Sequence, residues 1–495
     1  MSILLKSIHL KLLILKKIVG VDYMSSGLGL SVLAIYGLFA FAMTYYFSRG
    51  YDKNKTSFLV ANRELNTYQG SMSVAAAWLW APGLFISAQQ AYVNGFNGLF
   101  WFCLGNFLTL GAFAYFAKRI RDDKPQGFTF SGYLKEKFSG RVQSVFVVEM
   151  MILAICAFAI NLLAGSKTVE VLTGLNYNLV TFLMAGIAIL YSFRTGLKAT
   201  VITEQIKIVV VWLGVLILVP WVIVNAGGWE TVTAGFSGIK DPSMLSIFLG
   251  FGAAAFLGHM GGPWGDNSFY QRAFSIKKKS IIPSFVLASF IFIVVPIMMG
   301  LLGFVGAGAG LDITDVGTTN AQVIAHFLPG FASVIFMFIV FSGLIAILDS
   351  QFASIANMTG HDVYNKFKTK TAKGNEIVWA RYGMIALAIA GLIIANIPGM
   401  TLLYLFLFFA VLRASVWLPS MISILKPHWV NERGMFWGIV IAATIGEALF
   451  VYGKLGYGNT AFIGTMIAIF GSPILTLLIS NWKPYSSDQW KKVNY

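Results

Sequence analysis

Residues 70–95 read GSMSVAAAWLWAPGLFISAQQAYVNG, and the rest of the chain can be understood by working outward from them. The stretch is apolar enough to cross a bilayer, yet Pro82 and Gly83 stand at its centre. Proline removes a backbone donor and glycine loosens the helix, so the freed backbone groups need partners that lipid cannot supply. One interpretation is a kinked core helix. The other is a discontinuous helix whose free backbone groups face a solute or an ion in a protein-lined cavity.

The composition is that of an integral membrane protein. Of 495 residues, 57% are hydrophobic and 11% are charged, whereas roughly a quarter of the residues are charged in soluble domains. The mean hydropathy is +0.75. The continuous apolar runs suit spanning helices and exclude the alternating pattern of a β-barrel. Cys103 and Cys156 both lie in apolar runs, so they predict neither a disulfide framework nor a metal site.

Thirteen apolar stretches predict an all-α protein. They cover residues 27–47, 70–92, 96–118, 141–170, 176–194, 199–225, 244–268, 282–306, 332–358, 377–396, 400–424, 434–453 and 459–481. Connections rich in Lys and Arg alternate with connections that hold only Lys167, Lys240 and Lys454. By the positive-inside rule the basic connections are cytoplasmic. We therefore expect a multi-pass protein of the plasma (inner) membrane with its N-terminus outside and its C-terminus in the cytoplasm. The net charge of +16 then reflects topology, so the expected surroundings are membrane lipid and no nucleic acid.

A second interrupted span covers residues 244–272, MLSIFLGFGAAAFLGHMGGPWGDNSFYQR. Gly261, Gly262 and Pro263 break its apolar run. This span is the seventh and the first broken span is the second, so each of two blocks of five spans begins with its broken helix. An odd repeat length inverts the second block relative to the first. Interrupted segments at matching positions of two halves are typical of a binding site at the midplane of a transporter.

Four short stretches carry a resemblance to a known family. Residues 195–207, TGLKATVITEQIK, are similar to Gly-Gly-Leu-x-Ala-Val-x-x-Thr-Asp-x-x-Gln, and residues 264–272, WGDNSFYQR, are similar to Asp-Gln-Ser-Tyr-Trp-Gln-Arg. Residues 348–364 resemble a small-residue run that ends in Asp-Ile-Tyr, and residues 78–101 resemble Trp-Thr-Trp-Ala followed by Gly-x-x-Gly-x-Phe-Trp. These motifs resemble the sodium:solute symporter family, and most closely its urea-transporter-like branch. The resemblance implies a fold of the leucine-transporter type, with a 5+5 inverted repeat and two discontinuous helices.

This resemblance also implies a domain organisation. The transporter domain would cover 27–482, with a leading helix at 27–47, a first repeat at 70–225, a second repeat at 244–424 and two trailing helices at 434–481. Residues 1–26 would form an N-terminal extension and 483–495 a cytoplasmic tail. The lysines within residues 1–23 conflict with an outer location. That segment could be an amphipathic interfacial helix, a signal-like segment, or an extension upstream of a translation start at Met24, which is the interpretation we favour.

The resemblance implies a sodium ion where the second span meets the ninth. Its ligand positions would be the carbonyls of Ala76, Leu79 and Gly343 and the side chains at 346 and 347, which are Ala346 and Ile347 here. The family has two hydroxyls at those last positions, so two of about five oxygen ligands are lost. A shifted register would bring in Asp349 and Ser350. In the original register, Asp349 could accept a proton as the coupling ion or hydrogen-bond a neighbouring helix.

Other intramembrane residues are candidates for the solute and the exit path. The predicted solute-binding residues are Trp78, Trp80, Gln89, His259, Trp264 and Asp266. The spacing of Trp78 and Trp80 places them on different helix faces, so we expect at most one to face the site. Asp266 could instead fix the turn that follows the break. Glu204 is predicted to guide a departing cation, or else to pair with Lys207 at helical spacing.

The function predicted from these features is secondary active transport. The chain would move a small polar solute, urea or an amino acid, by symport with sodium or protons, and would use no cofactor besides the coupling ion. An uncoupled uniporter is the alternative, because the hydroxyl pair of the ion site is missing. An intramembrane enzyme would need clustered catalytic groups, and neither His-Glu-x-x-His nor Gly-x-Ser-x-Gly occurs. A sensor would need an output domain.

Overall fold

The computed structural model describes residues 25–48, 55–193, 197–367, 375–456 and 460–482. The expectations for residues 1–24 and 483–495 lie outside the described residues. The first half contains α2 (Ser26–Ser48), α3 (Lys55–Val60), α4 (Thr67–Trp78), α5 (Ala81–Asp123), α6 (Phe130–Lys137), α7 (Gly140–Thr173), α8 (Tyr177–Ser192), α9 (Leu197–Asn225) and α10 (Trp229–Ala234). The second half contains α11 (Met244–Ile247), α12 (Ala253–Met260), α13 (Asn267–Ser275), α14 (Ile281–Gly308), α15 (Thr319–Phe327), α16 (Gly330–Asn357), α17 (Tyr364–Phe367), α18 (Glu376–Ala395), α19 (Leu402–Leu425), α20 (Glu432–Lys454), α21 (Thr460–Met466) and α22 (Ser472–Trp482).

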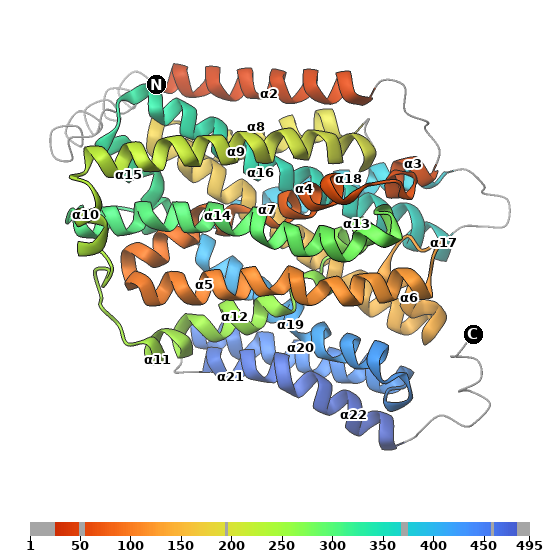
Figure 1. Ribbon diagram of the computed structural model, residues 1–495. Helices are drawn as coiled ribbons and strands as arrows, with labels where there is room; N and C mark the ends of the chain where they lie inside the picture. Colours follow the sequence, from red (N-terminus) through yellow and green to blue (C-terminus); the bar gives the residue numbers. More distant parts are fainter. Residues whose placement is uncertain (1–24, 49–54, 194–196, 368–374, 457–459, 483–495) are drawn as a thin grey trace.

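The described part of the chain is an all-helical bundle. Ten of its helices are long and apolar enough to cross a membrane, and two shorter apolar helices cover residues 177–190 and 244–260. Figure 1 shows the long helices roughly side by side, with α2 at one edge of the bundle and α20 to α22 at the opposite edge. The short helices α3, α6 and α17 lie together at one end of the bundle, and α10 and α11 lie at the other (Figure 1).

A kink at Gly95 separates the helix predicted over 96–118 from the end of the first broken span. α5 runs for 43 residues, and only Gly95 departs from helical geometry inside it, with φ 61° and ψ −151°. A side chain at this position would have its Cβ 2.1 Å from the carbonyl oxygen of Phe236. Glycine is therefore required both by the left-handed φ and by the close approach of the segment after α10.

The expected cytoplasmic side is held together by hydrogen bonds between segments far apart in sequence. Leu65, just before α4, accepts from the backbone N–H of Lys277 at 2.9 Å and donates to the carbonyl of Ser275 at 3.1 Å. The Arg63 guanidinium donates to the carbonyls of Gly127 and Phe274 at 2.7 and 3.2 Å. Burial, together with the nearby charge of Arg121, lowers the pKa of Arg63 to about 10, so it is still charged at neutral pH. The segment before α4 thus meets the segments after α5 and after α13 at this end.

Asp362, in the π-helical turn after α16 (Met358–Val363), is a second anchor on this side. Its Oδ1 accepts from Thr129 Oγ1 and Gln143 Nε2, both at 3.1 Å, and its Oδ2 accepts from Ser131 Oγ at 2.6 Å. The carboxylate therefore ties α16 to α6 and α7, and its charge is stabilised by three neutral donors.

We expect Asp362→Ala to lower the free energy of unfolding by more than about 2 kcal/mol, because three buried donors lose a charged acceptor. Unfolding of the purified protein in detergent, followed by circular dichroism, measures the change. Asp312→Ala is the matched control, since Asp312 is exposed and its loss should change stability by less than about 0.5 kcal/mol. Equal effects of the two substitutions would contradict the anchoring role.

Candidate functional site

The first discontinuous helix breaks at Leu79 and Trp80, between α4 and α5. Leu79 has ψ 77° and Trp80 is extended, with φ −108° and ψ 177°. The break therefore precedes Pro82 and Gly83, where the sequence pattern placed it. Pro82 lies in the first turn of α5, where its missing N–H would have no helical partner in any case.

A side chain from α7 compensates for the break. The Oδ1 of Asn161 accepts from the freed backbone N–H of Ala81 at 2.9 Å, and its amide donates to the carbonyl of Ala157 at 2.6 Å. Asn161 is fully buried. Asn161 is not among the site residues predicted from the sequence. Its signal was a lone amide in the middle of an apolar span, which is costly in lipid unless it satisfies another polar group.

The second discontinuous helix breaks between α12 and α13. A short 3₁₀ turn (Gly262–Trp264) follows α12, and Asp266 then caps α13 by accepting from the backbone N–H of Ser268 at 2.8 Å. This cap is the structural role expected for Asp266. A Cβ on Gly262 would lie 2.2 Å from the ring of Trp78. Glycine here allows the two broken segments to touch.

Arg413 of α19 lies where the two breaks meet. Its guanidinium carbon is 4.5 Å from the ring centre of Phe409, 5.5 Å from that of Trp78 and 5.7 Å from that of Trp80. These four residues, with Asp266, Gln351, Ala77, Ala157 and Ile347, line a cavity of about 10 Å³, which we call the aromatic chamber. Such a volume holds about one water molecule. Arg413 is 1% exposed, so it is a buried charge within an apolar helix.

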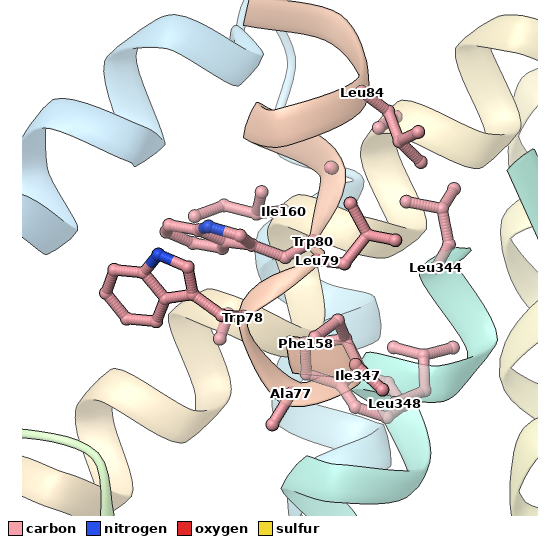
Figure 2. Close-up of a cluster of buried hydrophobic side chains, with 14 of the residues drawn as sticks. Ala77, Trp78, Leu79, Trp80, Leu84, Phe158, Ile160, Leu344, Ile347 and Leu348 are labelled. Atoms are coloured by element: carbon pink, nitrogen blue, oxygen red, sulfur yellow. The ribbon is translucent and has the colours of Figure 1, made fainter. Parts of the chain in front are cut away.

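The structure brings together some of the predicted solute-binding residues. Both tryptophans and Asp266 line the aromatic chamber, and His259 contacts the rings of Trp78 and Trp80 with centroids 6.1 and 6.2 Å apart. The expectation that at most one tryptophan faces the site is wrong, because the break at Leu79 turns the chain between them. Figure 2 shows both rings on one side of the segment and Leu79 on the other.

The other two predicted solute-binding residues lie apart from the chamber. Trp264 is buried against the rings of Phe113 and Phe116 of α5, with centroids 5.3 and 4.9 Å apart. Gln89 is a buried residue of α5 and does not line the chamber either. A solute role for these two residues stays a prediction.

Aliphatic side chains surround the position predicted for the cation. Figure 2 shows Leu79, Leu84, Leu344, Ile347 and Leu348 in one buried cluster between the broken segment and α16. Ala76 and Ala346 are 1% and 3% exposed, and a Cβ on Gly343 would lie 2.9 Å from Leu84 Cδ1. No group of three or more His, Cys, Asp or Glu with metal-binding geometry occurs in the described ranges. The ligand role of Ala76, Leu79, Gly343, Ala346 and Ile347 stays a prediction.

Asp349 forms a buried ion pair with Lys207 of α9, and the two side chains are 3% and 1% exposed. Its other oxygen, Oδ1, accepts from Ser192 Oγ at 2.8 Å. The carboxylate thus joins α16 to α8 and α9. Helical spacing predicts Glu204 as the partner of Lys207, and the sequence contains no indication that α16 brings Asp349 to it.

Glu204 forms a second buried ion pair, one helical turn from the first. Its Oε1 is 2.6 Å from Arg272 Nη2, and both side chains are 0% exposed. Ser73 Oγ and Ser350 Oγ donate to the carboxylate, each at 2.6 Å. Because Arg272 also donates from Nε to the carbonyl of Ser73 at 3.1 Å, this cluster joins α4, α9, α13 and α16. The predicted role of Glu204 in cation exit remains a prediction.

Comparison with known proteins gives consistent matches. A profile of the sodium:solute symporter family matches residues 58–442. The chain is 23% identical to "Probable urea active transporter 1" of Schizosaccharomyces pombe, over 92% of this chain and 74% of that protein. It is 22% identical to "Urea-proton symporter DUR3" of Oryza sativa subsp. japonica, over 88% of this chain and 67% of that protein. The fold is similar to that of a Na+-coupled sialic acid symporter, with TM-score 0.75, 14% identity and coverage of 92% and 98%.

Proposed function

Because the chain belongs to the sodium:solute symporter family, we propose that it couples the uptake of a small neutral solute, with urea as the first candidate, to protons. Cation-coupled symport of a small solute follows from family membership. The choice of urea rests on the curated relatives, one of which is named as a urea-proton symporter. An amino acid remains the second candidate solute.

The observation that carries proton coupling is the buried Lys207–Asp349 ion pair beside an aliphatic ion position. A hard cation such as sodium needs several oxygen ligands, and the side chains at 346 and 347 supply none. The ammonium of Lys207 already provides a positive charge next to Asp349. A proton that binds the Asp349 carboxylate neutralises it and breaks its ion pair with Lys207. The loss of this contact allows α9 and α16 to separate.

We further propose that the thirteen spans form a 5+5 inverted repeat in the plasma membrane, with the N-terminus outside and the C-terminus in the cytoplasm. The two broken helices, whose breaks contribute Trp78, Trp80 and Asp266 to the lining of the aromatic chamber, support this arrangement. Alternating access would then come from the rocking of one repeat against the other.

The proposal predicts which gradient drives uptake. In proteoliposomes with labelled urea, an inward proton gradient at symmetric sodium should drive accumulation above the outside concentration. A sodium gradient at symmetric pH should give only equilibration. Sodium-driven accumulation would contradict proton coupling, and equilibration under every gradient would favour the uniporter. Labelled proline and glycine, assayed in the same vesicles, test the amino-acid alternative.

A further inference from the structure

Arg413 is a buried charge whose donors face the aromatic chamber. Its Nε and Nη2 are buried and have no hydrogen-bond partner among the described residues. The faces of Phe409, Trp78 and Trp80 surround the guanidinium, and Asp266 lines the same cavity. Cation–π contact compensates part of the cost of burying the charge, but a buried N–H donor still lacks an acceptor. The site is therefore complete only when an acceptor oxygen enters it.

The aromatic chamber contains further hydrogen-bond donors and an acceptor that lack partners. The indole N–H groups of Trp78 and Trp80 are buried donors without a partner within the described ranges, and so is the acceptor Gln351 Oε1. The amide of Gln351 is oriented, because its Nε2 donates to Asp266 Oδ2 at 3.2 Å. Most buried polar groups in proteins are paired, so this concentration of unpaired groups around one cavity points to a ligand.

We propose that the aromatic chamber binds the carbonyl group of a small planar amide, with Arg413 as the residue that selects it. This inference rests on the proposed function and names the solute contacts. The carbonyl oxygen accepts from Arg413 and from an indole N–H, an N–H of the solute donates to Gln351 Oε1, and the planar faces stack on the rings. Because the cavity holds about one water molecule in this conformation, the rings must part to admit the solute.

The same geometry excludes cationic solutes. Aromatic cages are well suited to bind quaternary ammonium groups. Here the guanidinium of Arg413 already occupies the cage formed by Trp78, Trp80 and Phe409. A second cation would be repelled by it. Removal of the guanidinium should therefore weaken the binding of amides and allow the binding of quaternary ammonium ions.

The test is equilibrium binding of labelled urea to the purified full chain in detergent, without any gradient. Arg413→Gln should weaken urea binding on the order of ten- to a hundredfold, the effect of losing a charge-assisted hydrogen bond. The same variant should acquire binding of tetramethylammonium, a result that mere loss of folding cannot produce. Arg433→Gln is the matched control, since Arg433 is exposed at the start of α20, and it should bind urea as the wild type does.

A competitor panel on the wild type tests the proposal without any variant. Acetamide should displace labelled urea. Thiourea should compete more weakly, because sulfur accepts hydrogen bonds poorly. Neither tetramethylurea, which has no N–H, nor tetramethylammonium should displace labelled urea. Unchanged urea affinity in Arg413→Gln, or tetramethylammonium binding by the wild type, overturns the role of Arg413. Absence of any amide binding by the wild type overturns the proposed solute as well, whereas urea binding without proton-driven uptake overturns only the coupling.

Discussion

Arg272→Gln is expected to lower the free energy of unfolding by about 3–5 kcal/mol, because it leaves the buried Glu204 carboxylate without its cation. Ser73 and Ser350 still donate to that carboxylate, but neutral donors do not replace a full positive charge. Unfolding in detergent measures the loss of stability. Transport should also fail, since the cluster joins four helices on the expected cytoplasmic side.

A double-mutant cycle separates the charge effect from lost packing. In Glu204→Gln/Arg272→Gln no net charge remains buried, so the double variant should be more stable than Arg272→Gln alone. Lys118→Gln is the control, since Lys118 and Asp122 form an exposed pair, each 38% exposed, whose loss should cost less than about 1 kcal/mol. A double variant no more stable than Arg272→Gln would show that Glu204 is not held as a charged partner.

The sequence predicted the architecture well because membrane helices leave strong local signals. Apolar length predicted membrane-spanning helices, of which the described residues contain ten long ones, and the paired interruptions at 70–95 and 244–272 predicted the two broken segments that meet at the aromatic chamber. The break predicted at Pro82 and Gly83 lies three residues past the observed break at Leu79 and Trp80. Proline marks the neighbourhood of a break, whereas the exact residue depends on Asn161 of α7, which satisfies the freed N–H of Ala81.

The pairing of charges could not be predicted in the same way. Glu204 and Lys207 are neighbours on one helix, so local spacing favoured a pair between them. Their observed partners, Arg272 and Asp349, lie 68 and 142 residues away along the chain. The surroundings of Arg413 could not be predicted either, because a charge within an apolar span predicts a functional group but does not name the rings that will surround it. Partners set by tertiary packing leave no periodicity in a single sequence.

Under the proposed proton coupling, Lys207→Ala is expected to create a site that binds sodium. Without the ammonium, Asp349 keeps its carboxylate and the Ser192 hydroxyl beside a space the size of the lost side chain. Carboxylate and hydroxyl oxygens in a small cavity are the ligands that hard cations prefer. Sodium should therefore raise the thermal stability of the variant, by about 2.7 kcal/mol at a hundredfold excess over its Kd, but not that of the wild type. Proton-driven accumulation should be lost.

The control for the predicted sodium binding removes the Asp349 carboxylate as well. Lys207→Ala/Asp349→Asn keeps the cavity but has no anionic ligand, so sodium should not stabilise it more than potassium or choline does at equal ionic strength. Sodium stabilisation of the wild type would mean that the ion position lies elsewhere and that Lys207 does not take the place of a cation. If Lys207→Ala still accumulates urea on a proton gradient alone, the ion pair is structural and the coupling proton binds another group. Either result separates the role of Lys207 from that of the aromatic chamber, because neither variant alters Arg413 or the rings around it.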